Sequence, residues 1–335
     1  MAENENHVLS IRMSHPYYSE KEISRILSTR DPKENNLRMQ AFAWISTLSK
    51  TLKFPVRTSG LAMLLYSRFQ LFFPVNEIPL LECATACLVV ASKIEDTAKK
   101  FRDILLAHYL QKHPGSEVDA HSQVCYKLIE ENKKRILGLE RMTLELICFD
   151  FRVRHPHNYM VKFAKSLKFS SSTASIAWNV CTDAYKTYTM LKYPAHIVAV
   201  ASISIACKLQ QLPQPIIPRS FFAPPALTEA VIADILDLYM HYQPHTCIGN
   251  MYTTEKLLGL CVDFQRAQKN SGRPQKPPQI DPHSSSLADE YRESNKRLQE
   301  SKESCARFIL DCDRKYFNTE FEKRMLEERR NKGTV

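Results

Sequence analysis

The chain has 335 residues, of which 44% are hydrophobic, a length that allows about two domains with a tail. It contains only 7 glycines, too few for the phosphate-binding loops and tight hairpins of nucleotide-binding folds. The formal net charge of +10 is spread along the chain, which suits acidic partners but falls short of the basic stripe of a nucleic-acid-binding protein.

The first 36 residues are expected to form an N-terminal extension that contains one short helix. Ser19 and Glu22 are spaced as a capping box, in which a hydroxyl and a carboxylate three residues apart bond each other's helix-start amides. This pair predicts a helix over 19–29, and the Asp-Pro step that follows ends it.

Residues 37–154 are predicted to form a first unit of five helices. Thr58 is expected to cap the second helix, and Pro79 opens the third. The third helix is apolar on nearly every face, which predicts the central, buried helix of the unit. The expected helices are 37–52, 58–73, 80–93, 98–113 and 122–149.

Residues 155–262 are predicted to follow the same order in a second unit. The central helix after Pro194 is again apolar and rich in small residues, which lets neighbouring helices approach closely in a compact bundle. The Pro-rich segment 213–225 is expected to be an irregular insertion. The expected helices are 159–167, 171–192, 194–209, 227–240 and 244–260.

The two units are related by an internal repeat at a constant offset of 115 residues. Residues 54–93 align without a gap on 169–208, and eight of the 40 positions are identical. In both copies a proline opens the central helix and a lysine, Lys93 or Lys208, closes it. The repeat predicts two copies of one helical domain, and hence an all-α fold.

The end of the chain divides into a linker and a charged tail. Residues 263–286 are polar and rich in Pro and Ser, the composition of a linker. Residues 287–335 are densely charged with a thin apolar stripe, which predicts a helical tail. This tail docks on the bundle or on a partner, or else it is a solvent-exposed helix.

Three stretches of the chain resemble the cyclin family, and within it the transcription-type cyclins. They are HPYYSEKEI before the first repeat, ACLVVASKIED at the end of its central helix, and ILGLERMTLELICFDFRVRHPHNY leading into the second repeat. The resemblance covers about 15–262 and is greatest to the fungal members that serve the kinase of the RNA polymerase II C-terminal domain. It implies two tandem five-helix cyclin repeats in a nuclear, non-catalytic subunit. Such a subunit binds and activates a cyclin-dependent Ser/Thr kinase that phosphorylates this domain during transcription elongation.

In cyclins, a lysine at the end of the third helix and a glutamate in the fifth together bind the kinase, and the resemblance places them at Lys93 and Glu140. Charge-assisted hydrogen bonds of this kind are strong when an interface shields them from water. For Lys93 alone, a solvated lysine favoured by the helix dipole is the competing interpretation, because Lys208 occupies the same place in the second repeat. The resemblance also assigns to the kinase-binding surface Val90, Ile94, Glu95, Asp96, Leu144, Phe149 and Phe151.

No pattern in the sequence predicts a catalytic centre, a cofactor or a metal site. The short signature strings of zinc proteases, serine hydrolases and NTPases do not occur. The ten cysteines include no C-x-x-C pair, which argues against a zinc ribbon and a redox dithiol. His241, His245 and Cys247 lack a fourth metal ligand at suitable spacing, and Pro244 interrupts their helix.

The expected partners are the catalytic subunit of a cyclin-dependent kinase and a third subunit of the same complex, which would grip the tail or the second repeat. We expect no direct nucleic-acid partner, because the positive charge is spread along the chain. We expect no membrane partner, because no signal peptide opens the chain and no apolar run spans a bilayer. The alternative is a DNA-bound general transcription factor of the factor IIB type, which also uses two cyclin-type repeats. Such a protein should show a basic face and usually an N-terminal zinc ribbon.

Overall fold

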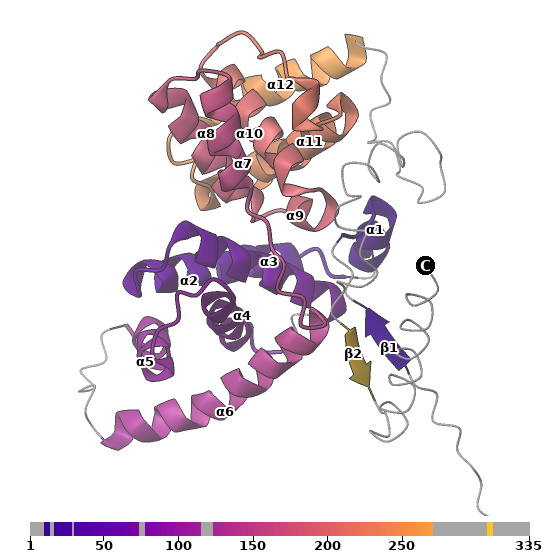
Figure 1. The fold of residues 1–335 in the computed structure, drawn as a ribbon. Helices are drawn as coiled ribbons and strands as arrows, with labels where there is room; N and C mark the ends of the chain where they lie inside the picture. Colours follow the sequence, from indigo (N-terminus) through magenta and orange to yellow (C-terminus); the bar gives the residue numbers. More distant parts are fainter. Residues whose placement is uncertain are drawn as a thin grey trace, which may run out of the picture.

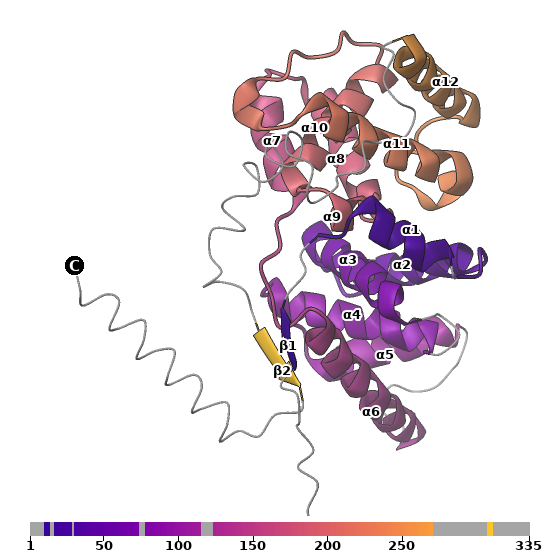
Figure 2. The same cartoon turned by 90° about the vertical axis from the view of Figure 1, so that its right-hand side faces the viewer.

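The computed structural model describes residues 10–13, 17–28, 30–73, 78–114, 123–270 and 307–310. In this part of the chain two helical units stack on one another, with the short helix α1 (Glu20–Ser28) beside their junction (Figures 1 and 2). The first unit comprises α2 (Glu34–Thr51), α3 (Val56–Phe72), α4 (Leu80–Ile94), α5 (Phe101–Lys112) and α6 (Gln123–Leu146). The second comprises α7 (Pro156–Ser166), α8 (Ser171–Ala184), α9 (Thr189–Lys192), α10 (Ala195–Leu209), α11 (Pro225–Tyr242) and α12 (Thr254–Asn270), with the 3-10 turns η1 (Arg219–Phe221) and η2 (Gln243–His245).

The central helix of each unit is α4 or α10, and the prediction that these helices are buried is confirmed. The offset of 115 residues carries the bounds of α4 onto those of α10, and Pro79 and Pro194 are the two N-caps. Their small residues, such as Ala84 and Ala199, are 0% exposed and let α3 and α8 pack closely against them. The all-α fold is confirmed for the described units, whereas the number of repeats stays a prediction.

The N-terminal helix α1 joins the two units. The predicted capping box is confirmed, since the Ser19 N–H donates to Glu22 Oε2 at 2.7 Å and the Glu22 N–H donates to Ser19 Oγ at 3.3 Å. The Lys192 ammonium, at the end of α9, donates to Glu20 Oε2 at 2.7 Å and also pairs with Asp234 of α11. Helix α1 therefore packs on the first unit and is tied by charge to the second.

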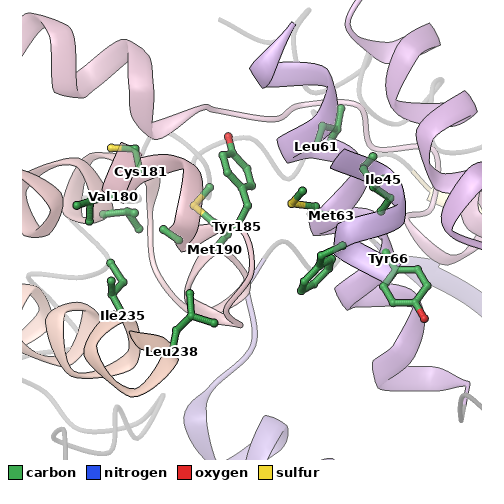
Figure 3. Close-up of a cluster of buried hydrophobic side chains, with 14 of the residues drawn as sticks. Ile45, Leu61, Met63, Tyr66, Val180, Cys181, Tyr185, Met190, Ile235 and Leu238 are labelled. Atoms are coloured by element: carbon green, nitrogen blue, oxygen red, sulfur yellow. The ribbon is translucent and has the colours of Figure 1, made fainter. Parts of the chain in front are cut away.

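The hydrophobic core is continuous across the junction of the units. Figure 3 shows Leu61 and Met63 of α3 on one side, and Tyr185 and Met190 of the second unit on the other. The approach is close at Gly60, where an added Cβ would lie only 2.7 Å from the Tyr185 ring. This shared core fixes the orientation of one unit relative to the other.

Most predicted helix ends lie within three residues of those in the structure. The helix over 171–192, the cap at Thr58 and the last helix are predicted wrongly, and a side-chain hydrogen bond accompanies each error. The helix expected over 171–192 is divided, because the Thr187 hydroxyl donates to the Ala184 carbonyl at 2.7 Å and accepts from the Thr189 N–H at 3.0 Å. Thr58 does not cap α3, which begins at Val56, and its hydroxyl instead lies 2.9 Å from the Thr97 hydroxyl.

The last helix, α12, is also displaced: it was expected over 244–260 and covers Thr254–Asn270. The chain turns before it because the Asp183 carboxylate accepts the backbone N–H groups of Cys247 at 2.7 Å and Ile248 at 3.0 Å. The linker predicted over 263–286 therefore begins too early, since 263–270 belong to α12, and its remaining residues lie outside those described.

One strand pair departs from the all-α prediction. Strands β1 (Ser10–Met13) and β2 (Arg307–Leu310) are antiparallel, with Ser10 opposite Leu310 and Met13 opposite Arg307 (Figure 1). The helical tail predicted over 287–335 is thus wrong for β2, whose Phe and Ile favour strands once a partner strand is present. The rest of that tail, and its docking, lies outside the described residues.

Candidate protein-binding surface

Lys93 and Glu140 meet on adjacent helices, as predicted. Lys93 lies in the last turn of α4 and Glu140 in α6, and the Lys93 ammonium donates to Glu140 Oε1. The side chain of Lys93 is 54% exposed, whereas that of Glu140 is 10% exposed. The lysine therefore faces solvent and the carboxylate anchors it from below.

This pair is better suited to binding than to holding the fold. An ion pair with one well-exposed partner contributes only about 0–1 kcal/mol to stability, because water screens it. Glu140 occupies one of the three donor positions of the Lys93 ammonium, so the others can serve acceptors on a second molecule. The pair thus presents an oriented positive charge at the end of a rigid, buried helix.

Exposed aromatic side chains lie in the segment that follows α6. Phe149 is 39% exposed and Phe151 is 48% exposed, and their ring centroids lie 6.4 Å apart in an edge-to-face arrangement. Ile94 and Leu144, two further residues of the predicted surface, are half-buried, and Asp96 is exposed. Apolar groups of this kind gain free energy when a partner covers them.

The segment that carries Phe149 is strained and held in place. Cys148 and Phe149 have φ values of 53° and 54°, in the left-handed region that non-glycine residues rarely adopt. Just beyond them, Arg152 Nε and Nη2 each donate to the Asp150 carboxylate at 2.7 Å. This backbone strain costs free energy, and the bidentate ion pair helps to hold the turn. Because strain of this kind concentrates at functional sites, it supports a binding role for the exposed rings.

Two of the predicted surface residues do not face solvent. Val90 is 1% exposed, because α4 is covered on nearly every side and only its last turn emerges, so the surface prediction is wrong for Val90. The Glu95 side chain is 11% exposed and points inward, where it lies 3.2 Å from Arg57 Nε and 2.8 Å from His155 Nε2. Its contacts are within the protein rather than at the edge of a surface.

Sequence reasoning missed His155. The histidine directly precedes α7, is 6% exposed, and places Nδ1 2.6 Å from the hydroxyl of Tyr185. The only sequence signal at this position is the His155-Pro156 step, which lies at the predicted start of the second unit.

The described residues offer little for covalent or metal chemistry. Over residues 17–270, apart from the short gaps, no three His, Cys, Asp or Glu side chains are grouped as metal ligands. Burial raises the pKa of the Cys181 thiol to about 12, so this cysteine is protonated and a poor nucleophile. The same part of the chain contains no helix that is long and apolar enough to cross a bilayer.

The family model of the cyclin N-terminal domain matches residues 13–152, which include the whole first unit and both members of the Lys93–Glu140 pair. The chain contains a cyclin N-terminal domain. Lys93 and Glu140 therefore lie on the domain in which the sequence resemblance predicted them.

Relatives of this cyclin domain extend along most of the chain. The chain is 30% identical over 202 residues to the CTD kinase subunit beta of Saccharomyces cerevisiae, covering 58% of this chain and 60% of that protein. It is 29% identical over 282 residues to Cyclin-T1-3 of Oryza sativa subsp. japonica, covering 80% and 57%. It spans less than two thirds of the length of these curated relatives.

A solved structure extends the likeness beyond the cyclin domain. A chain in the crystal structure of the yeast RNA Pol II CTD kinase CTDK-1 complex superimposes with a TM-score of 0.67 at 26% identity. The match covers 81% of this chain and 90% of that chain, so it includes the second unit as well as the first.

Proposed function

We propose that this chain is the cyclin subunit of a cyclin-dependent Ser/Thr kinase that phosphorylates the C-terminal domain of RNA polymerase II. In this proposal it acts in the nucleus during transcription elongation, and it activates the kinase without catalysing the reaction. The observation that carries the proposal is the oriented Lys93–Glu140 pair on a cyclin domain that also exposes the rings of Phe149 and Phe151. The likeness to a CTD kinase subunit and to a chain of a CTD kinase complex supports the choice of substrate.

The proposed mechanism is a population shift in the kinase. Phosphoryl transfer by protein kinases requires an ion pair between the ATP-binding lysine and a glutamate on a mobile helix of the kinase. Lys93 would donate to backbone carbonyls at one end of that helix, while Phe149 and Phe151 would cover its apolar side. Because these contacts favour the active arrangement, binding of the cyclin raises its population.

The test is a binding and activity measurement with the kinase that co-purifies with the tagged full-length chain. The double variant Lys93→Ala/Glu140→Ala should weaken the complex at least about 30-fold, because truncating a shielded charge pair typically costs 2–5 kcal/mol. The control, Lys133→Ala/Glu130→Ala, removes an exposed pair of the same type from the same helix, where Nζ and Oε1 lie 2.9 Å apart. Undiminished binding and kinase activity in the first double variant would refute the proposed surface.

A transcription factor of the factor IIB type is the less favoured function, because the relatives are cyclins and a CTD kinase subunit. A gel-shift titration separates the two functions. True phosphate contacts weaken steeply as salt rises. A steep salt dependence would favour the DNA-binding alternative.

A further inference from the structure

The junction between the two units contains a network of three hydrogen-bonded side chains, Glu95, His155 and Tyr185. Glu95 Oε1 lies 2.8 Å from His155 Nε2, and His155 Nδ1 lies 2.6 Å from the Tyr185 hydroxyl. A carboxylate only accepts, so Nε2 carries the proton that it donates to Glu95, and in the neutral imidazole Nδ1 is the atom that accepts the Tyr185 O–H. Burial raises the pKa of Tyr185 well above its usual range, so this hydroxyl keeps the proton that it donates.

Each residue of this hydrogen-bond network belongs to a different helix end. Glu95 is the C-cap of α4, His155 is the N-cap of α7 and Tyr185 is the C-cap of α8. Tyr185 is 1% exposed, and its ring contacts α3 at Gly60. The network therefore links the last turn of α4 to the first residue of the second unit and to the end of α8.

Lys93 lies in the same turn of α4 as Glu95. The Glu95 N–H donates to the Ala91 carbonyl at 3.0 Å, and the Asp96 N–H donates to the Lys93 carbonyl at 3.4 Å. Asp96 then leaves the helix with φ at 52°, so α4 ends abruptly beyond this turn. Whatever holds Glu95 therefore also holds the last turn of α4, which carries Lys93.

Glu95 has two charged or polar partners outside α4, and they differ in environment. Arg57 lies 3.2 Å from Glu95 Oε2, but its side chain is 56% exposed, so water screens this pair. The His155 side chain is 7% exposed, and its bond to Glu95 operates where few water molecules compete. Of the two, His155 is the more effective anchor.

We infer that His155 is a positioning residue, through which the second unit fixes the last turn of α4 and sets the affinity of the Lys93–Glu140 surface for the kinase. This inference rests on the proposed function. It gives the second unit a part in kinase binding that requires no contact between that unit and the kinase.

The experiment compares two amide replacements that differ in reach. His155→Gln places an amide N–H near the position of Nε2 and keeps a donor for Glu95, whereas His155→Asn is too short to reach it. The matched control is His157→Asn, because His157 is also buried but bonds Thr182 at 3.0 Å rather than Glu95. Full-length variants are titrated with the kinase that co-purifies with the natural chain, and thermal unfolding verifies that each variant folds.

The inference predicts that His155→Asn weakens kinase binding about tenfold, the scale of one hydrogen bond to a charged group, and that His155→Gln binds within about twofold of the natural chain. His157→Asn should leave the affinity unchanged. Because His155 acts through Lys93, His155→Asn should cause no further loss when combined with Lys93→Ala.

Equal affinities of His155→Gln and His155→Asn, or additive losses in the combined variant, would overturn the inference. If Lys93→Ala still weakens binding in that case, the proposed function stands without the positioning role. If Lys93→Ala binds as tightly as the natural chain, the proposed surface fails as well.

Discussion

Gly60→Ala is expected to destabilise the protein, although the substitution improves the local helix. Alanine is favoured over glycine by about 0.8–1.0 kcal/mol in a helix interior, and Gly60 lies within α3. Its Cβ, however, would lie 2.7–2.9 Å from three atoms of the Tyr185 ring. That ring is buried and its hydroxyl is bound to His155, so it has little freedom to move away.

The magnitudes decide the sign. Overpacking a tight core typically costs 1–3 kcal/mol, and displacing Tyr185 would also lose its hydrogen bond, about 1 kcal/mol more. We therefore expect a net loss of about 1–3 kcal/mol, measured by urea unfolding followed by circular dichroism at 222 nm.

Gly138→Ala is the matched control for this prediction. Gly138 lies in α6, and an added Cβ would have nothing within 4 Å. This variant should gain up to about 1 kcal/mol from helix propensity alone. If Gly60→Ala were as stable as Gly138→Ala, the close packing of the two units at Tyr185 would be refuted.

Three further predictions concern burial, pH and the exposed surface. Asp183→Ala should cost about 3–5 kcal/mol in urea unfolding, because it leaves the buried Lys186 ammonium, now 2.9 Å from Oδ1, without its counter-ion; a loss below about 1 kcal/mol would contradict the geometry. Burial lowers the pKa of His108 and His157 from 6.5 to about 4, so both are neutral in the folded state and protonate only on unfolding as pH falls. The free energy of unfolding should therefore fall as pH drops through 6.5, by about 1.4 kcal/mol per histidine at pH 5.5. A urea midpoint that does not change between pH 7.5 and 5.5 would show that these histidines are not buried in the neutral form. Phe151→Ser, at a side chain 48% exposed, should cost about 1 kcal/mol of stability through the lost edge-to-face pair with Phe149 and weaken kinase binding about tenfold, and unchanged affinity would remove this ring from the surface.

The elements that sequence predicted well depend mainly on local pattern. Helices α4 and α10 begin after Pro79 and Pro194 and are apolar on nearly every face, so their start and their burial follow from residues within one segment. The capping box at the start of α1 is equally local. The meeting of Lys93 with Glu140 is different, since 47 residues separate them and only the family resemblance indicated it.

The elements that sequence missed depend on partners far along the chain. Local spacing predicted a helix from 244, but the backbone N–H groups of Cys247 and Ile248 bond Asp183, which lies more than 60 residues earlier. The family resemblance assigned Glu95 to the surface, yet its side chain turns inward to His155, 60 residues later. Helix periodicity describes the spacing of apolar residues within one segment, and it contains no information about a distant carboxylate or imidazole.

Lys93 and Lys208 illustrate why position in a repeat does not assign a role. Both lie in the last turn of a central helix, related by the same offset of 115 residues. Lys93 meets Glu140 and stays exposed, whereas the Lys208 ammonium lies 5.1 Å from the centroid of the Phe264 ring of α12. Burial lowers the pKa of Lys208, and the ring face attracts the cation, so this lysine is used inside its own unit. The residue that α6 or α12 places opposite the lysine determines whether it faces a partner.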